Sequence, residues 1–206
     1  MLFTPLGGAR TTKLTHHRLS TVAMILFVLG VALAWFVLFH LNTWLFSRIH
    51  LTGFISWIFL PAAIRMFAVI VGGWAGALGL FFGAILTNLS LLKYEPFNIV
   101  MLAGLSALGP LVAFNLCTRW LKLPRDLAGL QHSQLLVFAV AGAIFNSFPH
   151  NLYFYFKGLS PDAWSGVVPM FVGDLAGTLI VLYLASLAIR LFTKDARGYK
   201  AGRTGS

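Results

Sequence analysis

Charged residues are scarce in this sequence: only 10% of its 206 residues are charged, and only five of them are acidic. An ordinary soluble domain carries about 25% charged residues. A soluble chain with so few charges would be unable to cover its surface with polar groups. The scarcity of charge therefore argues against a soluble enzyme or a disordered chain, and it predicts an integral membrane protein whose main partner is the lipid bilayer.

Cysteine is nearly absent as well. Cys117 is the only one, which excludes an intramolecular disulfide, a disulfide scaffold and a cysteine-based metal cluster. Neither a P-loop, an HExxH motif, a GxSxG motif nor a pair of carboxylates occurs, and no stretch is long enough for a soluble catalytic domain. We therefore predict that the protein is not an enzyme and that it uses no cofactor and no metal.

Long apolar runs are what the sequence has in abundance, since 59% of its residues are hydrophobic and its mean hydropathy is +0.86. A membrane-spanning helix needs about 20 mainly apolar residues. Six such stretches lie at about 20–40, 52–71, 74–91, 97–117, 134–156 and 166–192. The first is longer than the apolar part of a signal peptide and no cleavage site follows it, which favours a retained anchor. Gly72-Gly73 separates the second and third spans, because paired glycines end helices.

These runs predict an all-α integral membrane protein with a bundle of about six transmembrane helices over residues 20–192. A basic cytoplasmic segment at 1–19 precedes it, and a basic cytoplasmic tail at 193–206, expected to be disordered, follows it.

The cations far outnumber the acids, 15 to 5, which gives a net charge of +10. In a soluble protein this balance would suggest nucleic acid. With the N-terminus in the cytoplasm, however, eleven cations fall in the predicted inner segments and three, Arg48, Lys93 and Lys157, in the outer loops. This asymmetry follows the positive-inside rule. It predicts that both termini are cytoplasmic, that the charge orients the chain and contacts anionic lipid, and that no nucleic acid binds.

Two ionisable residues lie inside predicted spans: Arg65, one turn after Pro61, and Asp174. An ionisable residue within a span is costly and indicates a functional site. Two interpretations stay open. The residues form a structural ion pair between the second and sixth spans, or they line a polar cavity that binds a ligand or a proton. A third option places Asp174 near the outer surface.

Polar residues also cluster in the fifth predicted span. Asn146, His150 and Tyr153 fall on one helical face, and Pro149 interrupts or kinks the helix and frees the carbonyl of residue 145. Such helices mark cavities in membrane proteins, although Asn, His and Tyr are also common near lipid headgroups. The cavity interpretation suits Asn146 and His150, and the interfacial one suits Tyr153. The predicted ligand-binding or ion-pair set is Arg65, Asp174, Asn146, His150, Asn151, Tyr153, Trp57 and Thr178.

Glycines recur at three- and four-residue spacings in two spans. They are Gly76, Gly79 and Gly83 in the third span, and Gly173 and Gly177 in the sixth. Small residues at this spacing let helix backbones approach closely. We therefore predict a helix-packing role for them, with the third and sixth spans in the centre of the bundle.

Three segments resemble the MASE1 type of bacterial membrane-associated sensor domain: Phe59–Arg65 (FLPAAIR), Phe82–Asn88 (FGAILTN) and Val172–Gly177 (VGDLAG). The resemblance covers about Leu45 to Phe192. It implies a sensory protein in the bacterial inner membrane. Such domains usually feed a diguanylate cyclase, phosphodiesterase or histidine kinase on the same chain. Only a basic tail follows the last span here, so the resemblance implies signalling through a separate protein.

A second, weaker resemblance is to the substrate-binding membrane subunits of energy-coupling-factor vitamin transporters, which also have six spans and Gly-rich second and third helices. Three hypotheses therefore stand. The first is a stand-alone sensory or accessory protein that binds a small ligand or a membrane or cytoplasmic partner protein. The second is a small-solute transporter or its binding subunit. The third is a structural or assembly subunit without a ligand.

Overall fold

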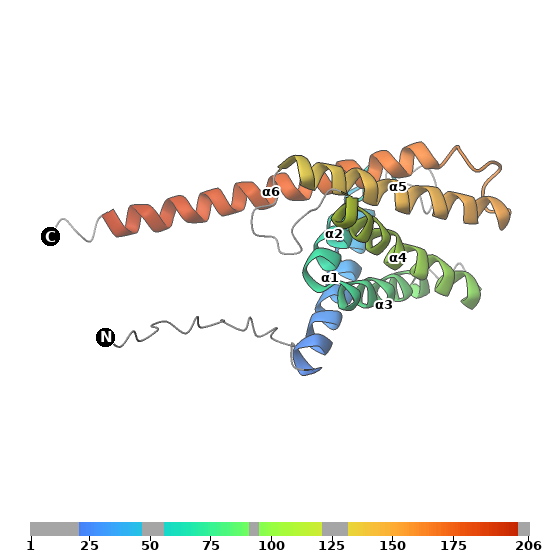
Figure 1. The fold of residues 1–206 in the computed structure, drawn as a ribbon, viewed down its shortest axis with the longest axis horizontal. Helices are drawn as coiled ribbons and strands as arrows, with labels where there is room; N and C mark the ends of the chain where they lie inside the picture. The colour runs from blue at the N-terminus through green and yellow to red at the C-terminus, as the bar shows by residue number, and fades with distance from the viewer. Residues whose placement is uncertain (1–20, 47–55, 91–94, 121–131, 202–206) are drawn as a thin grey trace, which may run out of the picture.

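The computed structural model of the chain describes residues 21–46, 56–90, 95–120 and 132–201, with side chains described through Leu184. Six helices account for nearly all of these residues, and no strand occurs among them (Figure 1). The helices are α1 (Thr21–Leu45), α2 (Pro61–Gly72), α3 (Trp74–Ser90), α4 (Pro96–Trp120), α5 (His132–Phe156) and α6 (Val167–Ala201). The all-helical class is therefore as the sequence predicts.

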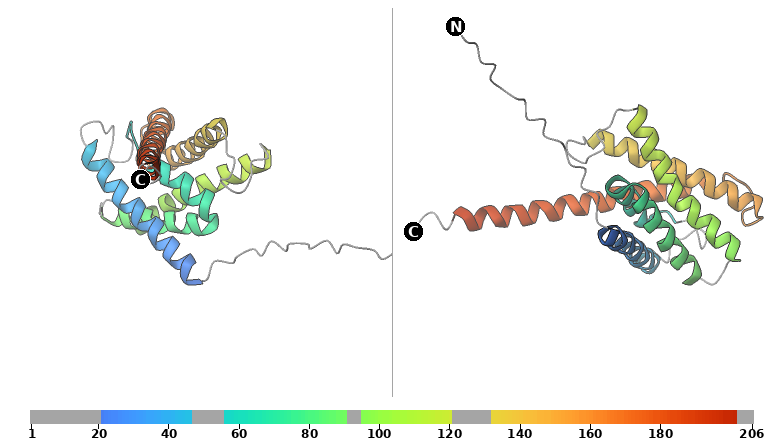
Figure 2. Two further views of the ribbon diagram at one scale, coloured as in Figure 1. Left: turned by 90° about the vertical axis from the view of Figure 1, so that its left-hand side faces the viewer. Right: turned by 60° about the horizontal axis from the view of Figure 1, so that its bottom comes forward.

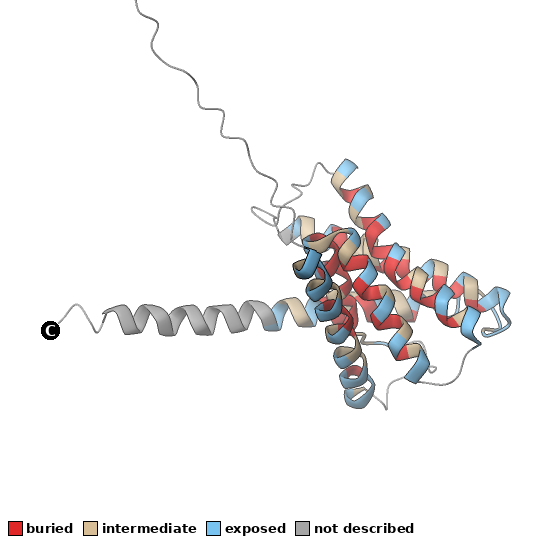
Figure 3. Cartoon of the chain, turned by 90° about the horizontal axis from the view of Figure 1, so that it is seen from below, coloured by how far each residue is buried: buried red, intermediate tan, exposed pale blue. Residues whose placement is uncertain are grey.

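Four of the helices, α1, α4, α5 and α6, are long and apolar enough to cross a membrane. Their outward faces carry large apolar side chains, such as Leu26, Leu29 and Leu33 of α1, which are 60 to 63% exposed. Figure 3 shows the buried residues gathered in the middle of the bundle and the exposed ones around it. An apolar surface this extensive suits a lipid environment and not water.

The second predicted span, 52–71, differs from the structure. Residues 52–55 lie outside the described part of the chain, and α2 is a helix of only 12 residues that begins at Pro61. Proline has no N–H with which to continue a helix from before it, so it stands at the first helical position. Ser56–Leu60 is non-helical, and the backbone N–H groups of Phe59 and Leu60 donate to Gly173 O (3.0 Å) and Asn42 Oδ1 (2.9 Å). Irregular backbone at membrane depth is tolerated where protein buries it in this way.

The turn between α2 and α3 falls where the sequence predicts it. Gly73 has a φ of +52°, a conformation that glycine adopts without steric cost. Its N–H donates to Val69 O at 2.8 Å and closes the end of α2.

Helix α2 occupies the centre of the bundle, which corrects the prediction that the third and sixth spans do. It contacts all five other helices, whereas α3 contacts α1, α2 and α4, and α6 contacts α2 and α5. Within the described residues α1 and α6 do not touch, and the segment Ser56–Leu60 bridges them. The end-on view of Figure 2 shows the other helices around α2. Because α2 is short, the longer helices can enclose it, and most of its residues are buried.

The glycines of α3 and α6 lie at close backbone approaches. A Cβ atom at Gly76 would overlap Ala68 O, and Gly79 and Gly83 face Val31 and Trp35 of α1. Gly173 and Gly177 instead face the carbonyls of Ser56 and Phe59, which a Cβ atom would overlap. The α6 glycines therefore admit the non-helical segment beside α6, and not a second helix.

The C-terminal region also differs from expectation. Helix α6 continues to Ala201, through most of the predicted disordered tail. Residues 193–201 are rich in Lys, Arg and Ala, which favour helix formation.

Candidate functional site

Arg65 and Asp174 form a buried ion pair between α2 and α6. Arg65 Nη1 lies 2.7 Å from Asp174 Oδ2, and the two residues are 5% and 3% exposed. Asn146 of α5, which is fully buried, donates from Nδ2 to the same carboxylate oxygen at 2.6 Å. Asp174 is therefore buried among the helices of the bundle, and its depth within a membrane stays a prediction. We call Arg65, Asp174 and Asn146 the charged network.

Local structure places each member of the network. Arg65 stands one turn after Pro61, the residue at which α2 begins. Asp174 follows Gly173, whose missing side chain lets α6 approach the segment before α2. This approach brings the carboxylate within reach of the guanidinium, although 109 residues separate the two in sequence.

Arg65 also contacts two aromatic rings, which were not among the predicted site residues. Its Cζ atom lies 5.1 Å from the ring centroid of Trp35 in α1 and 5.0 Å from that of Phe59. Trp35 in turn donates from Nε1 to Thr87 Oγ1 at 3.4 Å. A guanidinium over aromatic faces gains cation–π stabilisation, which is largest where water is excluded. Nothing in the sequence separates Trp35 from the other aromatic residues of its apolar run, so only the fold could assign it.

Several buried polar atoms, three in the charged network and one in Asn151, have no protein partner. Among the described residues these buried atoms are Arg65 Nε, Asp174 Oδ1, Asn146 Oδ1 and Asn151 Oδ1. A buried polar atom without a partner costs about 1–3 kcal/mol. Asp174 accepts both of its hydrogen bonds through Oδ2 and none through Oδ1. The hydrogen-bonding capacity of the network is therefore only partly used, whereas a purely structural ion pair would be expected to use all of it.

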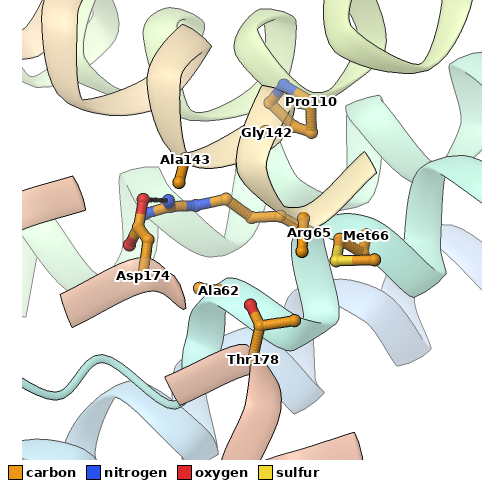
Figure 4. Close-up of a pocket in the computed structure, with 9 residues that line it drawn as sticks. Ala62, Arg65, Met66, Pro110, Gly142, Ala143, Asp174 and Thr178 are labelled. Atoms are coloured by element: carbon orange, nitrogen blue, oxygen red, sulfur yellow. Dashed lines mark hydrogen bonds and ion pairs between the residues drawn. The ribbon is translucent and has the colours of Figure 1, made fainter. Parts of the chain in front are cut away.

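A small cavity lies beside the ion pair, between α2, α4, α5 and α6 (Figure 4). Its volume, taken as the space open to the centre of a water-sized sphere, is about 10 Å³, close to what one water molecule needs. Its polar lining is Arg65, Asp174 and Thr178, and the rest is Ala62, Met66, Pro110, Ala139, Gly142 and Ala143. Arg65 and Asp174 therefore pair with each other and also border a cavity, and the binding of a ligand or a proton there stays a prediction.

His150 extends the polar contacts from α5 to α4. Its Nδ1 lies 2.8 Å from Asn146 O, and its Nε2 lies 3.3 Å from Ser106 Oγ. Because a carbonyl only accepts, Nδ1 is the donor, and Nε2 of the neutral ring then accepts from the Ser106 hydroxyl. His150 is therefore one hydrogen bond removed from the residue that holds Asp174.

Pro149 does not interrupt α5, which is helical through Phe156 and so differs from the predicted break. A proline still supplies no N–H to the carbonyl four residues earlier. That carbonyl, of Phe145, points at α4, where a Cβ atom on Gly109 would lie only 2.7 Å away. Glycine at this position lets α4 pack against the freed carbonyl.

The remaining predicted site residues lie apart from the charged network. Asn151 is buried and donates to Ser147 O at 2.8 Å, with Met170 Sδ at 3.5 Å. Tyr153 donates to Asn98 Oδ1 at 2.5 Å near the end of the helix pair. Trp57 is 41% exposed. Within the part of the chain that the structure describes, no group of three or more His, Cys, Asp or Glu side chains could hold a metal ion.

Gly142 offers a direct test of whether the cavity is empty space. A Cβ atom there would meet no protein atom within 4 Å, so the gain of about 0.5–1 kcal/mol that alanine brings to a helix over glycine should be offset in Gly142→Ala by the loss of a water molecule from the cavity. The full gain at Gly142 would mean that the cavity is empty. Gly104 of α4 has the same open surroundings but does not line the cavity, and Gly104→Ala is the matched control. Thermal unfolding of both variants in detergent measures the effect. Destabilisation at Gly142 alone would mean that the space is occupied.

Comparison with models of protein families, with characterised proteins and with solved structures finds no match to this chain. The fold and the site together define an all-helical protein with four helices able to cross a membrane and a buried Arg–Asp–Asn network at its centre.

Proposed function

We propose that this chain is a sensory or accessory protein of the bacterial inner membrane. In this proposal six helices form the membrane domain, with both termini on the cytoplasmic side. The charged network receives a small ligand or the contact of a partner protein, and the response passes to a separate protein. The observation that carries the proposal is that the Arg65–Asp174 ion pair is incompletely hydrogen-bonded. The Asp174 oxygen Oδ1 has no protein partner, and Asp174 lines a cavity. An ionisable group held inside a membrane domain is costly, and this cost makes it a candidate functional site.

The position of Asp174 on α6 supports a signalling role. The helix continues without a break from Asp174 to Ala201, a rise of roughly 40 Å at 1.5 Å per residue. Figure 1 shows this part of α6 reaching beyond the other helices. A change in the contact between Asp174 and Arg65 of α2 would therefore shift α6, whose C-terminal end lies outside the bundle. With the orientation that the charge asymmetry predicts, that end faces the cytoplasm, where a partner protein could bind it.

Transport is a second candidate, and one observation favours it. The short helix α2 follows a partly buried, non-helical segment, Ser56–Leu60, that packs on α6. Discontinuous helices of this kind build the substrate sites of many transporters. Uptake of labelled amino acids, vitamins and organic acids into proteoliposomes tests this candidate. The sensory proposal expects no more uptake than into protein-free vesicles.

Spin-label distances between α4 and α6 test the sensory proposal. Cysteines replace the exposed Leu108 and Leu184 in a Cys117→Ala background, which removes the native thiol. Asp174→Asn should change the distance distribution, because the neutral amide weakens the charge pairing that ties α6 to α2. Asp162→Asn, in the exposed loop before α6, is the control and should leave the distances unchanged. Identical distributions in all three proteins would contradict a signalling role for the network.

A further inference from the structure

We infer that the ligand of this site is a proton, which binds Asp174 at its free oxygen Oδ1. The inference rests on the proposed function and names the input of the same site. It is carried by the geometry of three features: the free carboxylate oxygen, the size of the cavity, and the second set of contacts made by Arg65.

The bonding of the carboxylate leaves one place for a proton. Oδ2 accepts from Arg65 Nη1 and Asn146 Nδ2, whereas Oδ1 is buried and has no protein partner. A proton on Oδ1 converts that oxygen into a donor without displacing either donor from Oδ2, although both bonds to Oδ2 lose their charge-assisted strength. The cavity that Asp174 and Thr178 line has room for one water molecule. That water can deliver the proton and then accept the hydrogen bond of the acid.

The same features disfavour other small ligands. An organic molecule is larger than the cavity, whose volume is about 10 Å³. A metal cation at Oδ1 would have to lie close to the fixed positive charge of Arg65, which is 2.7 Å from the same carboxylate group. An anion would meet the charge of Asp174 itself. A proton differs from all of these, because it bonds covalently to the carboxylate and removes its negative charge. It therefore needs no additional space in the cavity.

Arg65 remains held when Asp174 is neutral. The ring faces of Trp35 and Phe59 lie 5.1 Å and 5.0 Å from its Cζ atom, and cation–π contacts stabilise a guanidinium without a carboxylate. Both aromatic residues lie outside α6, in α1 and in the segment before α2. Protonation therefore weakens the tie between α2 and α6 while Arg65 stays in place. Arg65 keeps its aromatic contacts in both charge states of Asp174, and the charge pairing with α6 is what differs between the two states.

Few other titratable groups face Asp174. Among the described helices α6 contacts only α2 and α5, and the segment Ser56–Leu60, which also packs on α6, carries no titratable side chain. Helix α6 meets Arg65 from α2 and Asn146 from α5, behind which His150 binds the Asn146 carbonyl. Thr178 is the neighbouring polar residue on α6 itself. His150 is thus the second group whose charge would influence the site, and a protonated His150 would oppose the uptake of a proton at Asp174.

Infrared difference spectroscopy of the full chain in lipid vesicles tests the inference. The sequence has only five acidic side chains, so the carbonyl band of a protonated carboxylic acid can be assigned by substitution. Lowering the pH should produce a band that Asp174→Asn removes and Asp162→Asn retains. Asp162 provides a separate marker, because hydrogen bonds from the backbone N–H groups of Ser165 and Trp164 hold the pKa of its carboxyl below the usual value.

A second variant keeps the test decisive if Asp174→Asn does not fold. Thr178→Val removes the hydroxyl that borders the cavity and should shift the frequency of the Asp174 band without abolishing it. A folded Asp174→Asn protein with the same spectra as the wild type at every pH would overturn the inference, as would a band insensitive to Thr178→Val. Spin-label distances that respond to Asp174→Asn without such a band would mean that the network signals but that its ligand is not a proton. The band without a distance change would leave the proton site standing and refute the sensory role.

Discussion

Arg65→Ala and Asp174→Ala are each expected to lower the free energy of unfolding by about 3–5 kcal/mol. Either change leaves the partner as an uncompensated charge in a site that is less than 6% exposed. Asp162→Asn, in the exposed loop, keeps an oxygen that can accept from the N–H groups of Trp164 and Ser165. It should change stability by less than about 0.5 kcal/mol and serves as the control. Unfolding of the purified proteins in mixed detergent, followed by circular dichroism, measures the difference.

The charge-swapped double variant, Arg65→Asp with Asp174→Arg, separates the pair from its surroundings. Its reference variants are Arg65→Asp alone and Asp174→Arg alone. If the charges interact mainly with each other, the double variant is more stable than the sum of these two single losses predicts. Recovery should be partial, because the faces of Trp35 and Phe59 favour a cation at position 65 and would meet a carboxylate instead. Strict additivity of the two single losses would contradict the pairing.

Gly177→Ala is the second variant with a large expected effect, a loss of about 1–3 kcal/mol or more from overpacking. The added Cβ atom would overlap the carbonyl oxygen of Phe59, which is backbone and has no rotamer by which to move away. The displacement also moves the Phe59 ring, one of the two rings that hold Arg65. We therefore expect the variant to perturb the charged network as well as the fold. Thermal unfolding measures the first effect, and the spin-label distances between α4 and α6 measure the second.

Gly104→Ala is the matched control for this substitution, because a Cβ atom there meets nothing within 4 Å. It should stabilise its helix slightly, as alanine does relative to glycine. Gly177→Ala with the stability of the wild type would mean that Ser56–Leu60 does not pack against α6 as the structure has it.

The charged network ties the proposed function to the architecture. Its three residues come from α2, α5 and α6, and its aromatic neighbour Trp35 comes from α1. A single change of charge at Asp174 therefore alters the contact with Arg65 that joins α2, the central helix, to α6, the longest helix. Proximity alone does not make such a network a switch, which is why the spin-label and infrared measurements address the two states directly.

Sequence reasoning succeeded where a local chemical rule decides the outcome. The all-helical class follows from long apolar runs, and the turn at Gly72-Gly73 follows from glycine geometry. Arg65 and Asp174 stood out because ionisable residues are rare in apolar runs. The prediction for residues 52–71 was wrong because the long apolar stretch concealed the start of α2 at Pro61. Hydropathy registers only that these residues avoid water, and buried irregular backbone satisfies that condition as well as a helix does.

The amino-acid sequence by itself determined which residues are apolar enough for a membrane, where α2 ends at glycine, and which two charges stand among apolar neighbours. Only the tertiary structure decided that these two charges meet across 109 residues, that Trp35 and Phe59 hold the cation, and that α2 lies at the centre. The physical reason is that lipid and protein interior are equally apolar, so hydropathy does not distinguish the inward from the outward face of a helix. Close packing at glycine and the pairing of buried polar groups make that distinction, and both depend on residues far apart in the chain.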